Sequence, residues 1–240
     1  MGAQWKHAGR VENSSKRGAL IGKLVKEITV AAKVGDPSPD NNPRLRAGVE
    51  AARKASVPRD TIERAIKKGA GLLDDQVHYE TVTYEGFAMH QVPVIVECLT
   101  DNKNRTAADI RVLFRKGQLG SIGSVTWMFD RLGVVEATHA DSNQDLEGVA
   151  IEAGAQNFEA LEASELQKGQ AGGRFFCDTG DLDAVSKYLV KAGWVVTLSE
   201  MNYIAKNLLE ISAEQQKEVA EFLGAIDDHD DVHRIYTAIK

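Results

Sequence analysis

The residues best suited to a chemical role are lysines and arginines near the start of the chain. Residues Met1 to Leu73 contain 15 Lys+Arg against 7 Asp+Glu, a net charge of +8. Such side chains neutralise phosphates and release condensed counterions, which gives an affinity for nucleic acid that falls steeply with salt. Arginine can also bind phosphate or guanine in a bidentate manner. The candidate nucleic-acid-binding residues are Lys6, Arg10, Lys16, Arg17, Lys23, Lys26, Arg44, Arg46, Arg53, Lys54, Arg59, Arg64, Lys67 and Lys68.

The rest of the chain has the opposite charge. It holds 14 Lys+Arg against 28 Asp+Glu, a net of −14, so that the whole chain carries −6. A basic segment attracts polyanions while an acidic remainder limits nonspecific contact, and this asymmetry favours a nucleic-acid-facing module. The alternative is that these cations are the solvated faces of amphipathic helices, with Lys67 and Lys68 stabilising a helix C-terminus.

Two other segments resemble ligand sites, and a structural role is favoured for both. Gly117, Gly120 and Gly123 suggest a phosphate cradle, but no Gly-Lys-Ser/Thr follows and the segment does not precede a helix. We expect a loop there. Asp227–His233 combines carboxylates with imidazoles but lacks the calcium-loop pattern, so a solvated acidic turn is expected.

Two polar or aromatic segments have a binding and a structural interpretation. Trp5 could stack on a base, or dock onto the helices that follow. Asp101–Thr106 could contact RNA or a ribosomal protein through Lys103 and Arg105, but a turn with a helix cap is favoured.

No catalytic arrangement is recognisable in the sequence. There is no Ser-His-Asp, Cys-His or paired-carboxylate motif, and Cys98 and Cys177 have no partner at metal spacing. We therefore expect a protein that is not an enzyme, with no cofactor, no metal and no small-molecule substrate. No segment approaches the about 20 apolar residues of a membrane span, and no secretory signal is evident. A cytoplasmic protein without a membrane partner is expected.

The basic residues lie on predicted helices. Apolar residues at helical spacing predict a helix over Gly18–Lys33, and Asp36–Asp40 is a turn-rich linker. Asn42 and Pro43 are typical of an N-cap and first position of a second helix, which runs through Ala52. A third helix is expected from about Pro58 to Gly69.

The period then changes to that of strands. Glu80–Gly86 and Val92–Cys98 predict paired strands, followed by a helix from Asn104 and a strand over Ser124–Phe129. Further elements are strand Val134–Thr138, helix Leu146–Ala153, strands Phe158–Leu161 and Arg174–Asp178, helix Leu182–Ala192 and strand Trp194–Ser199. This β-α-β-β-α-β order is that of the split-βαβ, ferredoxin-like arrangement.

The remaining elements complete the first group of strands. The segment after the inserted domain supplies the elements that the Glu80–Phe129 half of the α/β domain lacks. These are Tyr203–Leu209, a helix over Ser212–Leu223 and a strand over Val232–Ile239. The fold class predicted is α+β, with an N-terminal three-helix domain and two ferredoxin-like α/β domains. We expect a basic helical domain with an N-terminal arm at 1–73, an α/β domain at 79–131 plus 202–240, and an inserted ferredoxin-like domain at 132–201.

Several stretches resemble a known family. They are Lys16–Gly18, Ile28–Ala32, Asn42–Arg46, Ile62–Gly69, Tyr84–Gly86, Leu99–Thr106 and Gly123–Asp130. The chain is similar to the YebC/PmpR family of bacterial regulatory proteins, which includes the mitochondrial translational activator of cytochrome c oxidase. It departs from the family's pattern in a shorter, less basic arm at Trp5–Asn13, and in Phe87–Gln91, which replaces a glycine-rich turn.

The resemblance implies three domains and a role in gene expression. Some family members are described as DNA-binding transcriptional regulators, and others as translation factors that associate with the ribosome. We expect a nucleic-acid-binding regulator, with DNA as the ligand, and keep a ribosome- or ribosomal-RNA-associated translation factor as the alternative. The second alternative is a protein-interaction scaffold.

Overall fold

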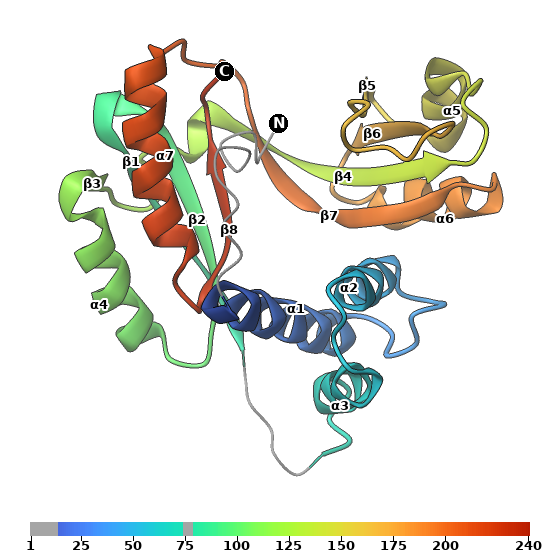
Figure 1. Ribbon diagram of the computed structural model, residues 1–240, viewed down its shortest axis with the longest axis horizontal. Coiled ribbons are helices and arrows are strands. Elements are labelled where there is room, and N and C mark those ends of the chain that lie inside the picture. Colours follow the sequence, from blue (N-terminus) through green and yellow to red (C-terminus); the bar gives the residue numbers. More distant parts are fainter. Residues whose placement is uncertain (1–13, 74–78) are drawn as a thin grey trace. The chain divides into compact units, whose positions relative to one another are not determined.

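The computed structural model describes residues 14–73 and 79–240 (Figure 1). The helices are α1 (Ser14–Val34), α2 (Pro43–Lys54), α3 (Arg59–Gly69), α4 (Lys103–Leu113), α5 (Leu146–Ala153), α6 (Leu182–Lys191) and α7 (Ala213–Asp227). The strands are β1 (Glu80–Phe87), β2 (Pro93–Thr100), β3 (Gln118–Leu119), β4 (Phe129–His139), β5 (Asn157–Ala160), β6 (Ala171–Cys177), β7 (Val195–Ala205) and β8 (Val232–Thr237).

The described residues form two compact units. The first unit contains 14–26, 79–130 and 203–240, and the second contains 27–73 and 131–202. Helix α1 therefore contributes its first half to one unit and its second half to the other. The division into three domains at 1–73, 79–131 with 202–240, and 132–201 stays a prediction.

The first unit is built on a sheet with the strand order β3-β1-β2-β8. Strands β1 and β2 pair antiparallel from Glu80↔Thr100 to Phe87↔Pro93. Every residue of β2 is buried, because alternate side chains face two cores. Val94 and Val96 pack with residues of α4 and α7, while Ile95 packs with Tyr236 of β8. Burial on both faces explains the mostly apolar composition of this strand.

The second unit contains a sheet with the order β5-β6-β4-β7, to which α5 and α6 contribute their apolar faces. The elements follow the β-α-β-β-α-β order expected from the sequence. With its two four-stranded antiparallel sheets, the chain has the α+β fold class that was predicted. The helices α2 and α3 belong to this unit, and α2 contacts α6.

The strand predicted over Ser124–Phe129 is wrong. The structure has a short 3₁₀ helix at Thr126–Met128, and β4 begins only at Phe129. The cause is the buried carboxylate of Glu85, which accepts hydrogen bonds of 2.8–2.9 Å from the backbone N–H groups of Gly123, Val125 and Thr126. These bonds bend a segment whose composition alone favours an extended strand.

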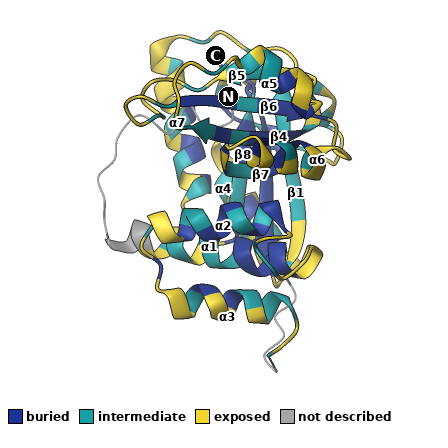
Figure 2. Ribbon diagram, turned by 90° about the vertical axis from the view of Figure 1, so that its right-hand side faces the viewer, coloured by how far each residue is buried: buried dark blue, intermediate teal, exposed yellow. Residues whose placement is uncertain are grey.

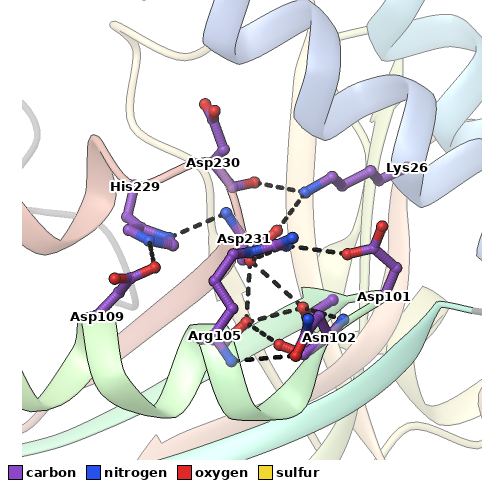
Figure 3. Close-up of polar contacts among 10 residues, drawn as sticks. Lys26, Asp101, Asn102, Arg105, Asp109, His229, Asp230 and Asp231 are labelled. Atoms are coloured by element: carbon purple, nitrogen blue, oxygen red, sulfur yellow. Dashed lines mark hydrogen bonds and ion pairs between the residues drawn. The ribbon is translucent and has the colours of Figure 1, made fainter.

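A buried carboxylate joins four elements of the first unit (Figure 3). Asp231, just before β8, is 4% exposed and accepts hydrogen bonds from Lys26 of α1 at 2.8 Å and from Arg105 of α4 at 2.8 Å. The hydroxyls of Thr106 and Thr100 lie 2.9 and 3.3 Å from the same carboxylate. Four donors on three other segments therefore converge on one charge.

These donors determine the charge state of Asp231. Burial by itself would raise the pKa of the Asp231 carboxyl, but hydrogen bonds from Arg105, Lys26 and Thr106 outweigh it and hold this pKa well below the usual range of aspartate. Because the folded-state pKa is below that of the unfolded chain, the stabilisation is complete above the unfolded-state value. It is lost as the pH falls from there towards the folded-state value.

We predict that Asp231→Asn lowers the free energy of unfolding by about 2–4 kcal/mol at neutral pH, because it leaves Lys26 and Arg105 without their shared carboxylate. The difference from the parent should stay constant down to about pH 5 and shrink below about pH 4, where the Asp231 carboxyl takes up a proton in the unfolded chain but not yet in the folded one. Urea unfolding at several pH values measures both effects. The matched control is Asp228→Asn, at an exposed position of the same turn; equal stabilities of the two variants would contradict the prediction.

The C-terminal end of α3 approaches α1 closely at Gly69. A Cβ atom at this position would lie 2.2 Å from the carbonyl oxygen of Thr29 and 2.8 Å from Cβ of Ala32. On the same side of α3, Ile62 and Ala65 are buried at helical spacing. Only glycine allows the two helix backbones to approach this closely.

Gly69→Ala should therefore push α3 away from α1 and lower the free energy of unfolding by about 1–3 kcal/mol. Gly224→Ala is the matched control, because it also replaces a helical glycine but has no atom within 4 Å of the new Cβ. That variant should be neutral or stabilised by up to about 1 kcal/mol. Thermal unfolding followed by circular dichroism compares the two, and a Gly69→Ala protein as stable as the control would exclude the close contact.

Candidate nucleic-acid interface

Helix α2 is held by the cap that the sequence indicated. The side chain of Asn42 accepts a hydrogen bond of 3.0 Å from the backbone N–H of Leu45, and Pro43 is the first helical residue. The amide nitrogen of Asn42 also donates to the carbonyl oxygen of Ala31 in α1, at 2.9 Å. One side chain therefore starts α2 and attaches it to the preceding helix.

Helix α3 places its cations away from its buried side. Arg64 and Lys67 follow Ile62 by two and five residues, which puts them opposite the buried positions of the helix. Both are exposed, and Lys68 beside them is half-buried. In Figure 2, where exposed residues are yellow, several positions of α3 are exposed. Helix α2 adds Lys54, exposed in its last turn.

The structure gives no side-chain contacts for the predicted cations at the N-terminus. Lys6 and Arg10, with Trp5, lie outside the described residues. Lys16 and Arg17 lie near the N-terminal end of α1. Their role in binding stays a prediction.

Three predicted cations are bound to carboxylates of the chain itself. Lys26 contacts Asp231 as described above, and Nζ of Lys23 lies 3.5 Å from Oδ1 of Asp227. The guanidinium of Arg44 donates two hydrogen bonds, of 2.7 and 3.1 Å, to the carboxylate of Glu27, whose side chain is 8% exposed. Removing a cation from such a pair takes away a charged partner of the carboxylate, and breaking a buried pair costs about 3–5 kcal/mol.

Three further arginines make contacts that water can reach. Arg53 pairs with Glu50 and Arg59 with Glu63, each at 2.7 Å, and all four side chains are exposed by 42% or more. Arg46 donates to the carbonyl oxygen of Asp40 at 2.5 Å. Exposed pairs of this kind contribute about 0–1 kcal/mol, so phosphate can displace the carboxylates at little cost.

The remaining predicted cations have no such pairing. Within the described ranges, no carboxylate lies at ion-pair distance from Lys54, Arg64, Lys67 or Lys68. These residues have exposed or half-buried charges available to an anionic ligand. They form the candidate interface, together with Arg53 and Arg59.

The other predicted sites have structural roles. Asn102 caps α4 by accepting from the N–H of Arg105, which confirms the predicted helix cap. Gly123 donates its N–H to Glu85 within a loop, as expected for that segment. The acidic turn differs from the prediction, because Asp231 is buried rather than solvated.

Sequence reasoning missed the contacts of this turn. The ring of His229 accepts from the N–H of Asp231 at 3.1 Å, and its Nε2 lies 3.2 Å from Oδ2 of Asp109. The only sequence signal was the mixture of His and Asp, which does not identify partners more than a hundred residues away. Across residues 14–73 and 79–240, no three or more His, Cys, Asp and Glu side chains are grouped so as to hold a metal ion. Of the helices in this part of the chain, none is long and apolar enough to cross a bilayer.

Comparison with known proteins agrees with this architecture. Residues 3–72 match the family model described as TACO1/YebC protein N-terminal domain, and residues 79–239 match TACO1/YebC second and third domain. A protein of Bdellovibrio bacteriovorus is 50% identical over 241 residues, covering all of both chains. One from Pseudomonas savastanoi pv. phaseolicola is 51% identical over 240 residues, covering 100% of this chain and 99% of its own. Both are named "Probable transcriptional regulatory protein".

A solved structure is similar over the whole length. The crystal structure of a conserved hypothetical protein from Aquifex aeolicus superposes with a TM-score of 0.78 at 34% identity, covering 99% of this chain and 96% of its own. The family models, the full-length relatives and the shared fold confirm the resemblance found in the sequence. This chain belongs to the TACO1/YebC family.

Proposed function

We propose that this chain regulates gene expression by binding the phosphate backbone of nucleic acid through the cations of α2 and α3. The names of its relatives support a regulatory role. The proposal requires no catalytic residue and places the chain in the cytoplasm. DNA is the first ligand to test, because the names of the relatives refer to transcription.

The observation that carries the proposal is the group of cations without carboxylate partners. Among the described residues, Lys54, Arg64, Lys67 and Lys68 have no ion pair, although the chain carries 35 acidic residues against 29 basic ones. In a chain with an excess of carboxylates, unpaired cations gathered on two neighbouring helices favour an external anion. Phosphate contacts of this kind determine affinity and orientation and carry no direct sequence information.

The lysines of α1 are a weaker part of the proposal. Lys23 and Lys26 are already bound to Asp227 and Asp231, so nucleic acid would have to displace partly buried carboxylates. Arg44 would have to leave Glu27. We therefore assign the binding energy to the exposed residues of α2 and α3.

We predict that Lys54→Glu/Arg64→Glu/Lys67→Glu lowers the affinity for nucleic acid at least roughly tenfold at moderate salt, because three cations that attract phosphate are replaced by carboxylates that repel it. On duplex DNA, the slope of log affinity against log salt should fall by about 0.9 for each phosphate that is no longer neutralised. Binding is measured by fluorescence anisotropy on a random-sequence DNA duplex and by co-sedimentation with ribosomes, each across a salt series.

The control is Lys168→Glu/Lys191→Glu/Lys217→Glu, which changes the net charge equally at three exposed lysines outside α2 and α3. It should bind as the parent does. Tight duplex binding identifies a DNA-binding transcriptional regulator, whereas preferential ribosome binding identifies a translation factor. If neither ligand binds, or if both triple variants bind equally, the cations of α2 and α3 are solvated surface and a protein scaffold is the better description.

A further inference from the structure

An apolar groove lies between α2 and α3, inside the second unit. Its floor consists of Val49 of α2, Val57 of the connecting turn, and Ile62 and Ile66 of α3, and its cavity volume is about 260 Å³. The first three floor residues are at most 6% exposed, while Ile66 is half-buried. Typical small-molecule sites span about 300–1,000 Å³. The groove therefore has room for one small flat or aliphatic group.

The floor and the walls of this groove differ in chemistry. The four floor side chains carry no hydrogen-bonding group, so they cannot bind a phosphate or a sugar hydroxyl. Arg53 and Arg59 also line the groove, with side chains 66% and 89% exposed, and so does Glu63, whose carboxylate is paired with Arg59. An occupant that fits has an apolar face for the floor and negative charge on both sides of it.

The arginines are available to such an occupant. Arg53 is paired only with Glu50 and Arg59 only with Glu63 among the described residues, and these exposed pairs are easily exchanged. A guanidinium that leaves a carboxylate can make a bidentate contact to a phosphate. The surrounding helices add charge of the same sign, since residues 43–70 hold 8 Lys+Arg against 3 Asp+Glu.

We infer that this groove binds one unstacked base of a single-stranded nucleic acid segment, with Arg53 and Arg59 on the adjacent phosphates. The inference rests on the proposed function and adds a preference for single-stranded over fully paired ligand. In a duplex the base faces are stacked on one another, and extracting one costs a few kcal/mol. Single strands, loops and bulges present unstacked base faces. Proteins that bind single-stranded nucleic acid often contact these faces with little preference for sequence. Single-stranded DNA and RNA share the chemistry, and the test separates them.

The test compares single strands of equal charge that carry or lack bases. Full-length protein is titrated by fluorescence anisotropy against a short thymidine oligonucleotide, a uridine oligonucleotide, and an abasic oligodeoxyribonucleotide with the same number of phosphates. A duplex of the same length is the fourth ligand. We expect about tenfold tighter binding of the base-bearing strands than of the abasic strand. A deoxyuridine oligonucleotide differs from the uridine oligonucleotide only in the sugar, so a difference between these two identifies the preferred sugar.

Two variants of the half-buried floor residue place the preference in the groove. Ile66→Ser makes the floor polar, and Ile66→Phe fills the groove while keeping it apolar. Both should abolish the preference for bases and leave the affinity for the abasic strand unchanged. Ile151→Ser, at a 71% exposed isoleucine of α5 in the same unit, is the matched control and should keep the preference. Thermal melting followed by circular dichroism shows which variants are folded. If Ile66→Ser does not fold, Ile66→Phe still tests the groove.

The outcomes separate this inference from the proposed function. Equal affinity of the parent for base-bearing and abasic strands overturns the base site, and leaves phosphate binding by α2 and α3 intact. It would make an apolar side chain of a protein partner the better occupant of the groove. A preference that survives in both Ile66 variants also overturns the inference, because the base is then bound elsewhere. Absence of binding to every oligonucleotide and to the duplex overturns both proposals together.

Discussion

The carboxylate of Asp231 is the constraint on which the first unit depends. It lies at the start of β8, and its donors come from α1, from α4 and from the end of β2. Each donor belongs to a different part of the unit, and all of them bind the same carboxylate. A single charge therefore positions the start of the edge strand β8, the first turn of α4 and the first half of α1. A buried anion of this kind is stable only when its hydrogen-bonding capacity is filled, and here it is filled by two cations and two hydroxyls.

The elements with local causes could be predicted from the sequence. Asn42 and Pro43 indicated the start of α2, and the structure has that cap. The run Val92–Cys98 indicated a strand paired with Glu80–Gly86, and β2 is paired with β1 in this way. The split-βαβ order followed from periodicity and turn residues. In each case the interaction that determines the structure lies within a few residues of the signal.

The elements with distant causes could not be predicted. Ser124–Phe129 has the composition of a strand, but Glu85, about forty residues earlier, accepts its N–H groups and bends it. The lysines of α1 form a charged stripe in the sequence. The same stripe is expected whether the face is exposed to solvent, binds phosphate or forms ion pairs within the chain. Their partners Asp227 and Asp231 lie 204 and 205 residues further along the chain. No pattern within the helix distinguishes these three cases.

The depth of the partner carboxylate determines which cations a nucleic acid can recruit. Arg44 and Arg59 have the same ion-pair distance of 2.7 Å, but Glu27 is 8% exposed and Glu63 is 47% exposed. Phosphate that takes Arg59 releases Glu63 into water, where its charge is solvated at once. Phosphate that takes Arg44 removes a charged partner from the desolvated carboxylate of Glu27, and this penalty offsets the gain. The net charge of +8 over Met1 to Leu73 therefore overstates the charge that can neutralise phosphate. What remains available among the described side chains lies mainly on α3 and at the end of α2, on the same two helices that enclose the apolar groove.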